Sequence, residues 1–395
     1  MPGWLASVAV ALCGVCAFLQ VYCTQPLLPM LTRLFHASKT GVGMTVSATT
    51  LGVALAAPFF GALAERLRRK RVIVLSLVGV ALPTLLAATS TSLWQLIFWR
   101  FLQGIMVPGI IAVVITYIGE EWPSNKVALI MSFYVSGTAL GGFIGRLTSG
   151  ILADMYSWRV GFVVLGVATM AGAGLVQLWL PNGSRRHATI PDFTPGDGRN
   201  LSPIYQSQAL LRYRRLLATY AVGFMALFSL VGVFTWITFH LSEAPFLLST
   251  TALSYLFFVY LVGFVVTPAA GHVITKVGLR KGIGGAISCS ITGVLLTLAP
   301  SLPVVILGLA LLSSGVFIAQ VASSSHLRVA APAGARVTAA GLYITCYYLG
   351  GTAAGVVPGI FWAIGKWPAC VAFIVFMQLV ALSIAMIGWR GPHAA

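Results

Sequence analysis

The sequence predicts an all-α membrane protein in which twelve transmembrane helices form two related six-helix halves. Of its 395 residues, 58% are hydrophobic and only 8% are charged, and the mean hydropathy is +0.96. Because about a quarter of the residues in a soluble domain are charged, this composition excludes a soluble protein. A basic segment that occurs twice, once after Pro58 and once after Pro268, indicates that the two halves are homologous.

The apolar runs have the length of membrane crossings, since about 20 apolar residues span the hydrocarbon core. We expect transmembrane helices at residues 5–30, 40–64, 72–90, 93–118, 127–153, 159–180, 215–240, 249–275, 282–300, 302–325, 334–362 and 367–389. The first run lacks the charged start and the small-residue cleavage pattern of a signal peptide, so we interpret it as a retained span. The chain therefore divides into an N-terminal half (1–180), a polar linker (181–214) and a C-terminal half (215–395).

The net charge of +17 follows the membrane topology and does not indicate a nucleic-acid partner. With twelve spans, eighteen of the 24 lysines and arginines fall on one side of the membrane. The other side receives only Arg33, Lys39, Arg159 and Lys366. Positive residues favour the cytoplasmic side, so we expect both termini and the linker in the cytoplasm. The arginine clusters of the linker are a candidate contact for anionic lipids.

The repeated basic segment is a candidate conformational latch. Glu65 lies among basic residues at a membrane boundary, so it can form an ion pair in one helical arrangement and lose it in another. The alternative is that these residues only fix the topology. The predicted latch residues are Gly61, Glu65, Arg66, Arg69 and Lys70 in the first copy and Gly271, Lys276 and Arg280 in the second.

Two arginines, Arg100 and Arg146, fall inside predicted spans, where a charge is costly and needs compensation. None of the seven acidic residues lies near the centre of a span. We expect Asp154 to pair with Arg146. For Arg100 two interpretations stay open: the guanidinium binds helix carbonyls and Gln103 and braces the bundle, or it faces a central cavity.

Glycines repeat on one face of the fifth predicted span, at positions 137, 141 and 145. This spacing allows a neighbouring helix to approach closely in a membrane. We expect the segment Gly137, Gly141, Gly142, Gly145 and Arg146 to serve helix packing or gating.

Three motifs make the chain resemble the major facilitator superfamily over nearly its full length. The first basic segment is similar to the pattern G-x-x-x-D-[RK]-x-G-[RK]-[RK], with Glu65 at the aspartate and Arg68 at the second glycine. Arg100, Gln103 and Gly104 match R-x-x-[QG]-G. The glycine segment is similar to the exporter pattern G-x-x-x-G-P-x-x-G-G, with Gly142 at the proline and Arg146 at the last glycine.

These variants most resemble bacterial inner-membrane proteins of the drug:proton antiporter branch. The resemblance implies a proton-coupled exporter of drug-like or amphipathic compounds with no cofactor or metal, which works as a monomer in the inner membrane. In that fold six spans meet at the axis. The candidate substrate-binding residues are then Tyr22, Gln25, Arg100, Gln103, Phe228, Trp236, Gln320, Tyr343 and Tyr347.

Other functions are weighed against this one. A carrier of a small anionic metabolite is the alternative, since Arg100 has no obvious carboxylate partner and no acidic residue lies near the centre of a span. A membrane enzyme is remote, because the scattered acids form no reactive constellation. The sequence contains no G-x-x-x-x-G-K-[ST] nucleotide motif, which argues against an ATP-driven pump, and Cys13 and Cys16 lack the second ligand pair that a metal site of that spacing needs.

Overall fold

The computed structural model of the chain describes residues 3–66, 68–181, 210, 212–332 and 335–389. Throughout these residues the secondary structure is helical and contains no strand. Nine helical stretches in this part of the chain are long and apolar enough to cross a membrane. Most of the linker predicted at 181–214 lies outside the described residues.

The N-terminal half contains eight α-helices and one 3₁₀ helix. In chain order they are α1 (Trp4–Phe18), η1 (Gln25–Leu27), α2 (Leu28–Leu34), α3 (Lys39–Arg66), α4 (Arg69–Ala87), α5 (Leu93–Met106), α6 (Pro108–Glu121), α7 (Ser124–Met155) and α8 (Trp158–Trp179).

The C-terminal half repeats this plan. Its elements are α10 (Arg214–Ser242), α11 (Thr250–Tyr255), η2 (Leu256–Leu261), α12 (Val262–Val277), α13 (Leu279–Leu296), α14 (Leu302–Ala330), α15 (Arg336–Val356) and α16 (Pro358–Gly388). Gly365 and Lys366 have non-helical backbone angles, so α16 consists of two helices joined at a kink.

The twelve predicted spans are confirmed, and several are built from more than one helix. The first crossing is α1 with η1 and α2, the fourth is α5 with α6, and the eighth is α11 with η2 and α12. The eleventh crossing is α15 with the first part of α16, whose second part is the twelfth. In the first, fourth and eleventh crossings a break falls where a proline stands at the start of a helix, namely Pro26, Pro108 and Pro358, because proline lacks the N–H that continues the ladder. The breaks of the eighth crossing, at Leu256 and Val262, have no such proline.

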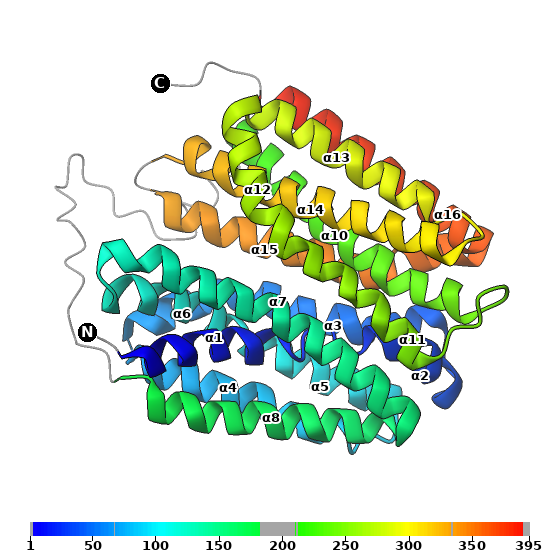
Figure 1. Cartoon of the computed structure of the whole chain (residues 1–395), viewed down its shortest axis with the longest axis horizontal. Helices are drawn as coiled ribbons and strands as arrows, with labels where there is room; N and C mark the ends of the chain where they lie inside the picture. The colour runs from blue at the N-terminus through cyan, green and yellow to red at the C-terminus, as the bar shows by residue number, and fades with distance from the viewer. Residues whose placement is uncertain (1–2, 67, 182–209, 211, 333–334, 390–395) are drawn as a thin grey trace.

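The two halves lie side by side as two bundles (Figure 1). The blue-to-green helices α1–α8 form one bundle and the green-to-red helices α10–α16 form the other. We call the end at which α1 begins the inner end, and the opposite end, where α2 ends and α3 begins, the outer end. Both α1 and α10 begin, and α8 and α16 end, at the inner end (Figure 1).

The two copies of the repeated segment differ at their turns. In the second copy Gly278 joins α12 to α13 with φ +85°, a backbone angle that favours glycine. The equivalent residue of the first copy, Arg68, has φ −63° and ψ 122°. The arginine therefore avoids the left-handed turn that its glycine counterpart adopts.

Candidate functional site

Arg100 stabilises the break in the first crossing. After α1 ends at Phe18, the chain turns before Pro26, and backbone carbonyls are left without helical partners. The buried Arg100 guanidinium donates to the carbonyl oxygens of Gln20 (2.5 Å) and Val21 (2.6 Å). It also donates to the Thr45 carbonyl oxygen of α3 at 3.2 Å. One side chain thus joins the turn that follows α1 to α3 and α5.

Gln103 extends this arrangement into a buried polar network. Its Oε1 accepts from Arg100 Nη1 at 2.6 Å and its Nε2 donates to Thr84 Oγ1 at 2.6 Å. Thr84 donates to Gln20 Oε1, and the Gln20 amide donates to Thr169. All of these side chains are buried within the N-terminal half. The arrangement favours the bracing interpretation of Arg100 and places Arg100 and Gln103 away from the space between the halves.

Arg146, in contrast, lies where the two halves meet. Its Nε donates to Gln25 Oε1 at 2.8 Å and its Nη1 to the Gly142 carbonyl oxygen at 2.7 Å. Three rings surround the guanidinium carbon: Tyr22 at 4.7 Å, and Phe257 and Tyr260 of η2 at 4.7 and 4.6 Å. Tyr22 belongs to the N-terminal half and the other two rings to the C-terminal half. Both halves therefore contact the same buried cation.

Tyrosines from α15 complete this centre. The phenol groups of Tyr22, Tyr260, Tyr347 and Tyr348 lie close enough for electrostatic interaction. The ring of Tyr347 is 5.6 Å from that of Tyr348 and 6.1 Å from that of Tyr343. The Tyr260 hydroxyl oxygen is buried and has no hydrogen-bond partner. We call the following residues the central cluster: Arg146, Tyr22, Gln25, Phe257, Tyr260, Tyr347 and Tyr348.

The remaining predicted binding residues do not all belong to this centre. Gln25 does, since its amide also donates to Thr235 Oγ1 of α10 at 3.1 Å. Phe228 is buried inside the C-terminal half against Phe224 and Phe373. Trp236 is buried near Gly43 of the other half and donates to the Ala354 carbonyl oxygen at 3.1 Å. Gln320 is half-buried on α14. Phe257, Tyr260 and Tyr348 were not predicted from the sequence.

The glycine stripe packs α7 against α1 of the same half. A Cβ atom on Gly137, Gly141 or Gly145 would overlap the backbone carbonyl of Ala11, Val15 or Leu19, respectively. The packing role predicted for these glycines agrees with this contact, and their partner is not the other half. Within the described residues, Gly150 is the α7 glycine that faces the C-terminal half, against Ser254 and Thr250.

Beyond Gly137, toward the inner end, α1 and α7 line an open pocket of about 550 Å³. Its walls are mostly apolar or aromatic and include Trp4, Trp122 and Phe133, with Lys126 as its charged group. This volume is in the range of sites for small organic molecules.

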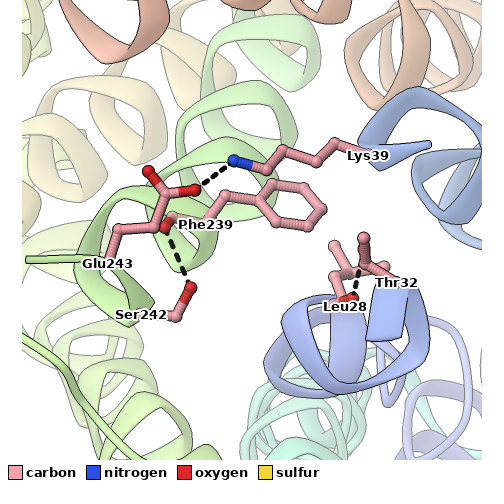
Figure 2. Close-up of polar contacts among 6 residues, drawn as sticks. All are labelled: Leu28, Thr32, Lys39, Phe239, Ser242 and Glu243. Carbon is pink, nitrogen blue, oxygen red and sulfur yellow. Dashed lines mark hydrogen bonds and ion pairs between the residues drawn. The ribbon is translucent and has the colours of Figure 1, made fainter. Parts of the chain in front are cut away.

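An ion pair joins the halves at the outer end. Lys39 at the start of α3 pairs with Glu243, the residue after α10 (Figure 2). The lysine Nζ lies 4.2 Å from the ring centre of Trp362 and 5.6 Å from that of Phe239. On either side, Thr32 donates to the Leu28 carbonyl and Ser242 to the Phe239 carbonyl (Figure 2). The Lys39 and Glu243 side chains are 27% and 43% exposed, so water reaches the pair.

Asp154 supplies a second contact between the halves at the outer end. Its Oδ2 accepts from the backbone N–H of Thr251 at 2.7 Å, at the first turn of α11. A carboxylate is favourable at a helix N-terminus. The expected pair of Asp154 with Arg146 is therefore wrong, because two helical turns separate the residues and Asp154 binds the opposite half.

The inner-end latch residues are described only in part. Within the described side chains, Arg69 pairs with Glu120 at the end of α6, which the sequence did not predict. Lys70 and Gly271 are half-buried, and Lys276 and Arg280 are exposed. The structure does not describe the side chains or surroundings of Gly61, Glu65 and Arg66.

Comparison with known proteins identifies the same architecture. The model of the Major Facilitator Superfamily matches residues 10–355. The inner membrane transport protein YnfM of Escherichia coli is 32% identical over 96% of this chain and 89% of its own length. An uncharacterized MFS-type transporter of Bacillus subtilis, YybF, is 32% identical over 93% and 89%.

Solved structures agree at the level of the fold. A bacterial homologue of the human lysosomal transporter Spinster, in its inward-facing and unoccupied conformation, superposes with a TM-score of 0.79. The two chains are 15% identical, and the match covers 97% of this chain and 96% of that one.

Proposed function

This chain belongs to the major facilitator superfamily and is a multi-pass membrane transporter, and we propose that it exports small amphipathic molecules by alternating access in exchange for protons. It would lie in the bacterial inner membrane with both termini in the cytoplasm, so the outer end would face away from the cytoplasm. The basic residues on one side support this orientation.

Alternating access is supported by the weak polar contacts that close the outer end. The Lys39–Glu243 pair is partly exposed, so it contributes about 0.2–1 kcal/mol, and the contact with Trp362 adds about 0.5–1 kcal/mol. Asp154 contributes hydrogen bonds with the first turn of α11, including one that it accepts from the backbone N–H of Thr251 at 2.7 Å. Contacts of this size can break and re-form without unfolding either half.

Small residues bring α3 and α15 together below this ion pair. The Ser47 hydroxyl donates to the Thr352 carbonyl oxygen at 2.6 Å, and the Thr352 hydroxyl donates to Thr50 at 3.1 Å. A Cβ on Gly43 would overlap the backbone of Gly355. The described surfaces of α3 and α15 are closely packed, but no large side chains interlock across them. Such surfaces can separate when the two halves move as rigid bodies.

An amphipathic substrate is supported by the composition of the two candidate sites. The open pocket between α1 and α7 is mostly apolar, with Ser7 and Lys126 as its polar side chains, and the central cluster combines aromatic rings with phenol groups and one guanidinium. Export and proton exchange rest on the likeness of the segment around Gly141 to exporters of the drug:proton antiporter branch.

Transport of a small anion remains the second candidate function, with Arg146 in place of Arg100 as the anion-binding residue. Arg100 is enclosed by acceptors of its own half, which makes it a poor anion site. Arg146 lies between the halves, and within the described residues it forms no ion pair with a carboxylate.

Reconstitution tests transport and its coupling. The purified protein is placed in proteoliposomes that contain a pH-sensitive dye, and amphipathic cations, neutral compounds and anions are added in turn. We expect substrate-dependent proton movement. Substrate flux without proton movement would overturn the coupling, and the absence of any flux across the panel would overturn the proposed function.

Cross-linking tests alternating access itself. Ser47→Cys with Thr352→Cys, in a chain without its native cysteines, places two thiols across the closed outer end. We expect oxidation to stop transport and reduction to restore it, while the Ser47→Cys single variant is unaffected. Undiminished transport by the oxidised, fully cross-linked protein would contradict the mechanism.

A further inference from the structure

We infer that Arg146 is the anion-binding group of the substrate site, and that the substrate is a small organic anion with a planar apolar body. This inference rests on the proposed function and adds the substrate class to it. It replaces Arg100 by Arg146 as the residue that recognises an anionic group.

The first support is the incomplete neutralisation of a buried charge. Arg146 is 2% exposed, and a buried guanidinium is costly unless its charge and its donors are matched. Of its five N–H donors, one binds the Gln25 amide oxygen and one the Gly142 carbonyl. Both acceptors are neutral. The faces of the three rings attract the cation, but they accept no hydrogen bond in the guanidinium plane.

Arg100 provides the internal comparison. It is equally buried, and its donors bind the carbonyl oxygens of Gln20, Val21 and Thr45 as well as Gln103. Within the described residues neither arginine has a carboxylate partner. Only Arg100 is surrounded by acceptors, so its charge serves the fold. Within the described residues no acceptor is found for the other Arg146 donors, and they match the two oxygens of a carboxylate, which a guanidinium binds in a planar fork.

The second support is an unpartnered hydroxyl beside the guanidinium. The Tyr260 hydroxyl oxygen is buried without a hydrogen-bond partner, although its ring is in contact with Arg146 at 4.6 Å. Buried polar groups are normally satisfied. A bound anion would accept from this hydroxyl and from Arg146 together, while the rings of Tyr22, Tyr347 and Tyr348 would contact a planar apolar body.

The position of the charge explains how binding would act on both halves. Arg146 comes from α7, Gln25 precedes α2, and Gln25 also binds Thr235 of α10. Phe257 and Tyr260 approach from η2 in the C-terminal half. An anion bound to Arg146 would therefore compete with contacts that join the halves. A ligand shifts a conformational equilibrium by its differential affinity for the two states.

The test uses matched probes that differ in charge. Full-length protein in proteoliposomes is offered benzoate, cinnamate and naphthoate, each beside its amide and the corresponding arylmethylammonium ion. We expect flux of the carboxylates. Arg146→Gln should lower their kcat/KM roughly ten- to a hundredfold, as the loss of a charge-assisted fork implies. Arg146→Lys should keep only part of the wild-type activity, because lysine has the charge but lacks the planar fork of donors.

Two further variants separate recognition from folding. Tyr260→Phe removes only the unpartnered hydroxyl and should raise KM for the carboxylates several-fold, whereas Tyr255→Phe, on the exposed Tyr255, should change nothing. Arg159→Gln removes an exposed arginine at the outer end and is the control for Arg146→Gln.

The outcomes separate the two proposals. Flux of the amides or ammonium ions alone, or carboxylate flux that Arg146→Gln leaves unchanged in folded protein, overturns the anion site and leaves the transport function standing. The absence of flux for every probe and every other amphipathic compound overturns the transport function as well. Carboxylate flux that is reduced in the Arg146 and Tyr260 variants, and unchanged in Arg159→Gln and Tyr255→Phe, supports both.

Discussion

Replacing Arg100 by glutamine should destabilise the N-terminal half far more than it alters substrate recognition. The Val21 carbonyl oxygen has Arg100 as its described partner, and the Gln20 carbonyl otherwise accepts only a long bond of 3.5 Å from Cys23 N. A buried acceptor without a partner costs about 1–3 kcal/mol. Two such carbonyls predict a loss of about 2–6 kcal/mol. The Thr45 carbonyl adds less, because it also accepts from Thr49 Oγ1.

Thermal unfolding of the purified protein in detergent, followed by tryptophan fluorescence at one scan rate, measures this loss. The control is Arg159→Gln, because Arg159 is exposed and donates one hydrogen bond, to the Ser90 carbonyl at 3.0 Å. We expect a clear fall in the unfolding temperature for Arg100→Gln and almost none for Arg159→Gln. An Arg100→Gln protein that unfolds like the wild type but no longer binds substrate would refute the bracing role.

Three further predictions concern helix contacts and the outer end. Gly141→Val should lower the free energy of unfolding by at least about 1–3 kcal/mol, because its side chain would overlap the Val15 backbone. Gly174→Val, whose side chain would enter open space, should be neutral. Equal unfolding temperatures for the two variants would contradict the packing. Lys39→Glu or Glu243→Lys alone should impair transport, because each places like charges together. The double exchange should restore part of the transport activity. A double variant that transports no better than either single variant would argue against the ion pair. Glu120→Gln should cost about 1 kcal/mol or less, since Arg69 and Glu120 are partly exposed, and a larger loss in the unfolding measurement would show that this pair braces the inner end.

The sequence predicted the crossings well because hydropathy and length decide them. Every expected span corresponds to one crossing, and α1 begins and α16 ends at the same end of the molecule (Figure 1), as an even number of crossings requires. The helix breaks were harder to place. Pro26 and Pro29 mark the break in the first crossing, but the sequence does not show that Arg100, far along the chain, would bind the freed carbonyls.

The central cluster could be predicted only in part. Tyr22, Gln25 and Tyr347 follow from the spans that meet at the axis, whereas Phe257 and Tyr260 look like the packing residues of any apolar helix. Arg146 was assigned to packing or gating because its neighbours in sequence are glycines. Only the rotation of α7 about its axis separates the glycines, which face α1, from the arginine, which faces η2.

Contacts between the halves are the least predictable feature. Lys39 and Glu243 are 204 residues apart, and each looks like an ordinary charge at a membrane face. Their pairing depends on how two separately folded bundles meet. Asp154 shows the same difficulty, because Arg146 on the same helix is not its partner and its partner is a helix terminus in the other half.

The most direct test of the account is the distance between the halves at the outer end. Spin labels at Leu34 and Ile364, both exposed and on opposite halves, report this distance by pulsed electron resonance in a chain without native cysteines. We predict a short distance for the closed state and a second, longer one whose population rises roughly threefold or more in Lys39→Gln, since about 0.7–2 kcal/mol is removed. A single distance that neither this variant nor added substrate changes would contradict alternating access through this end.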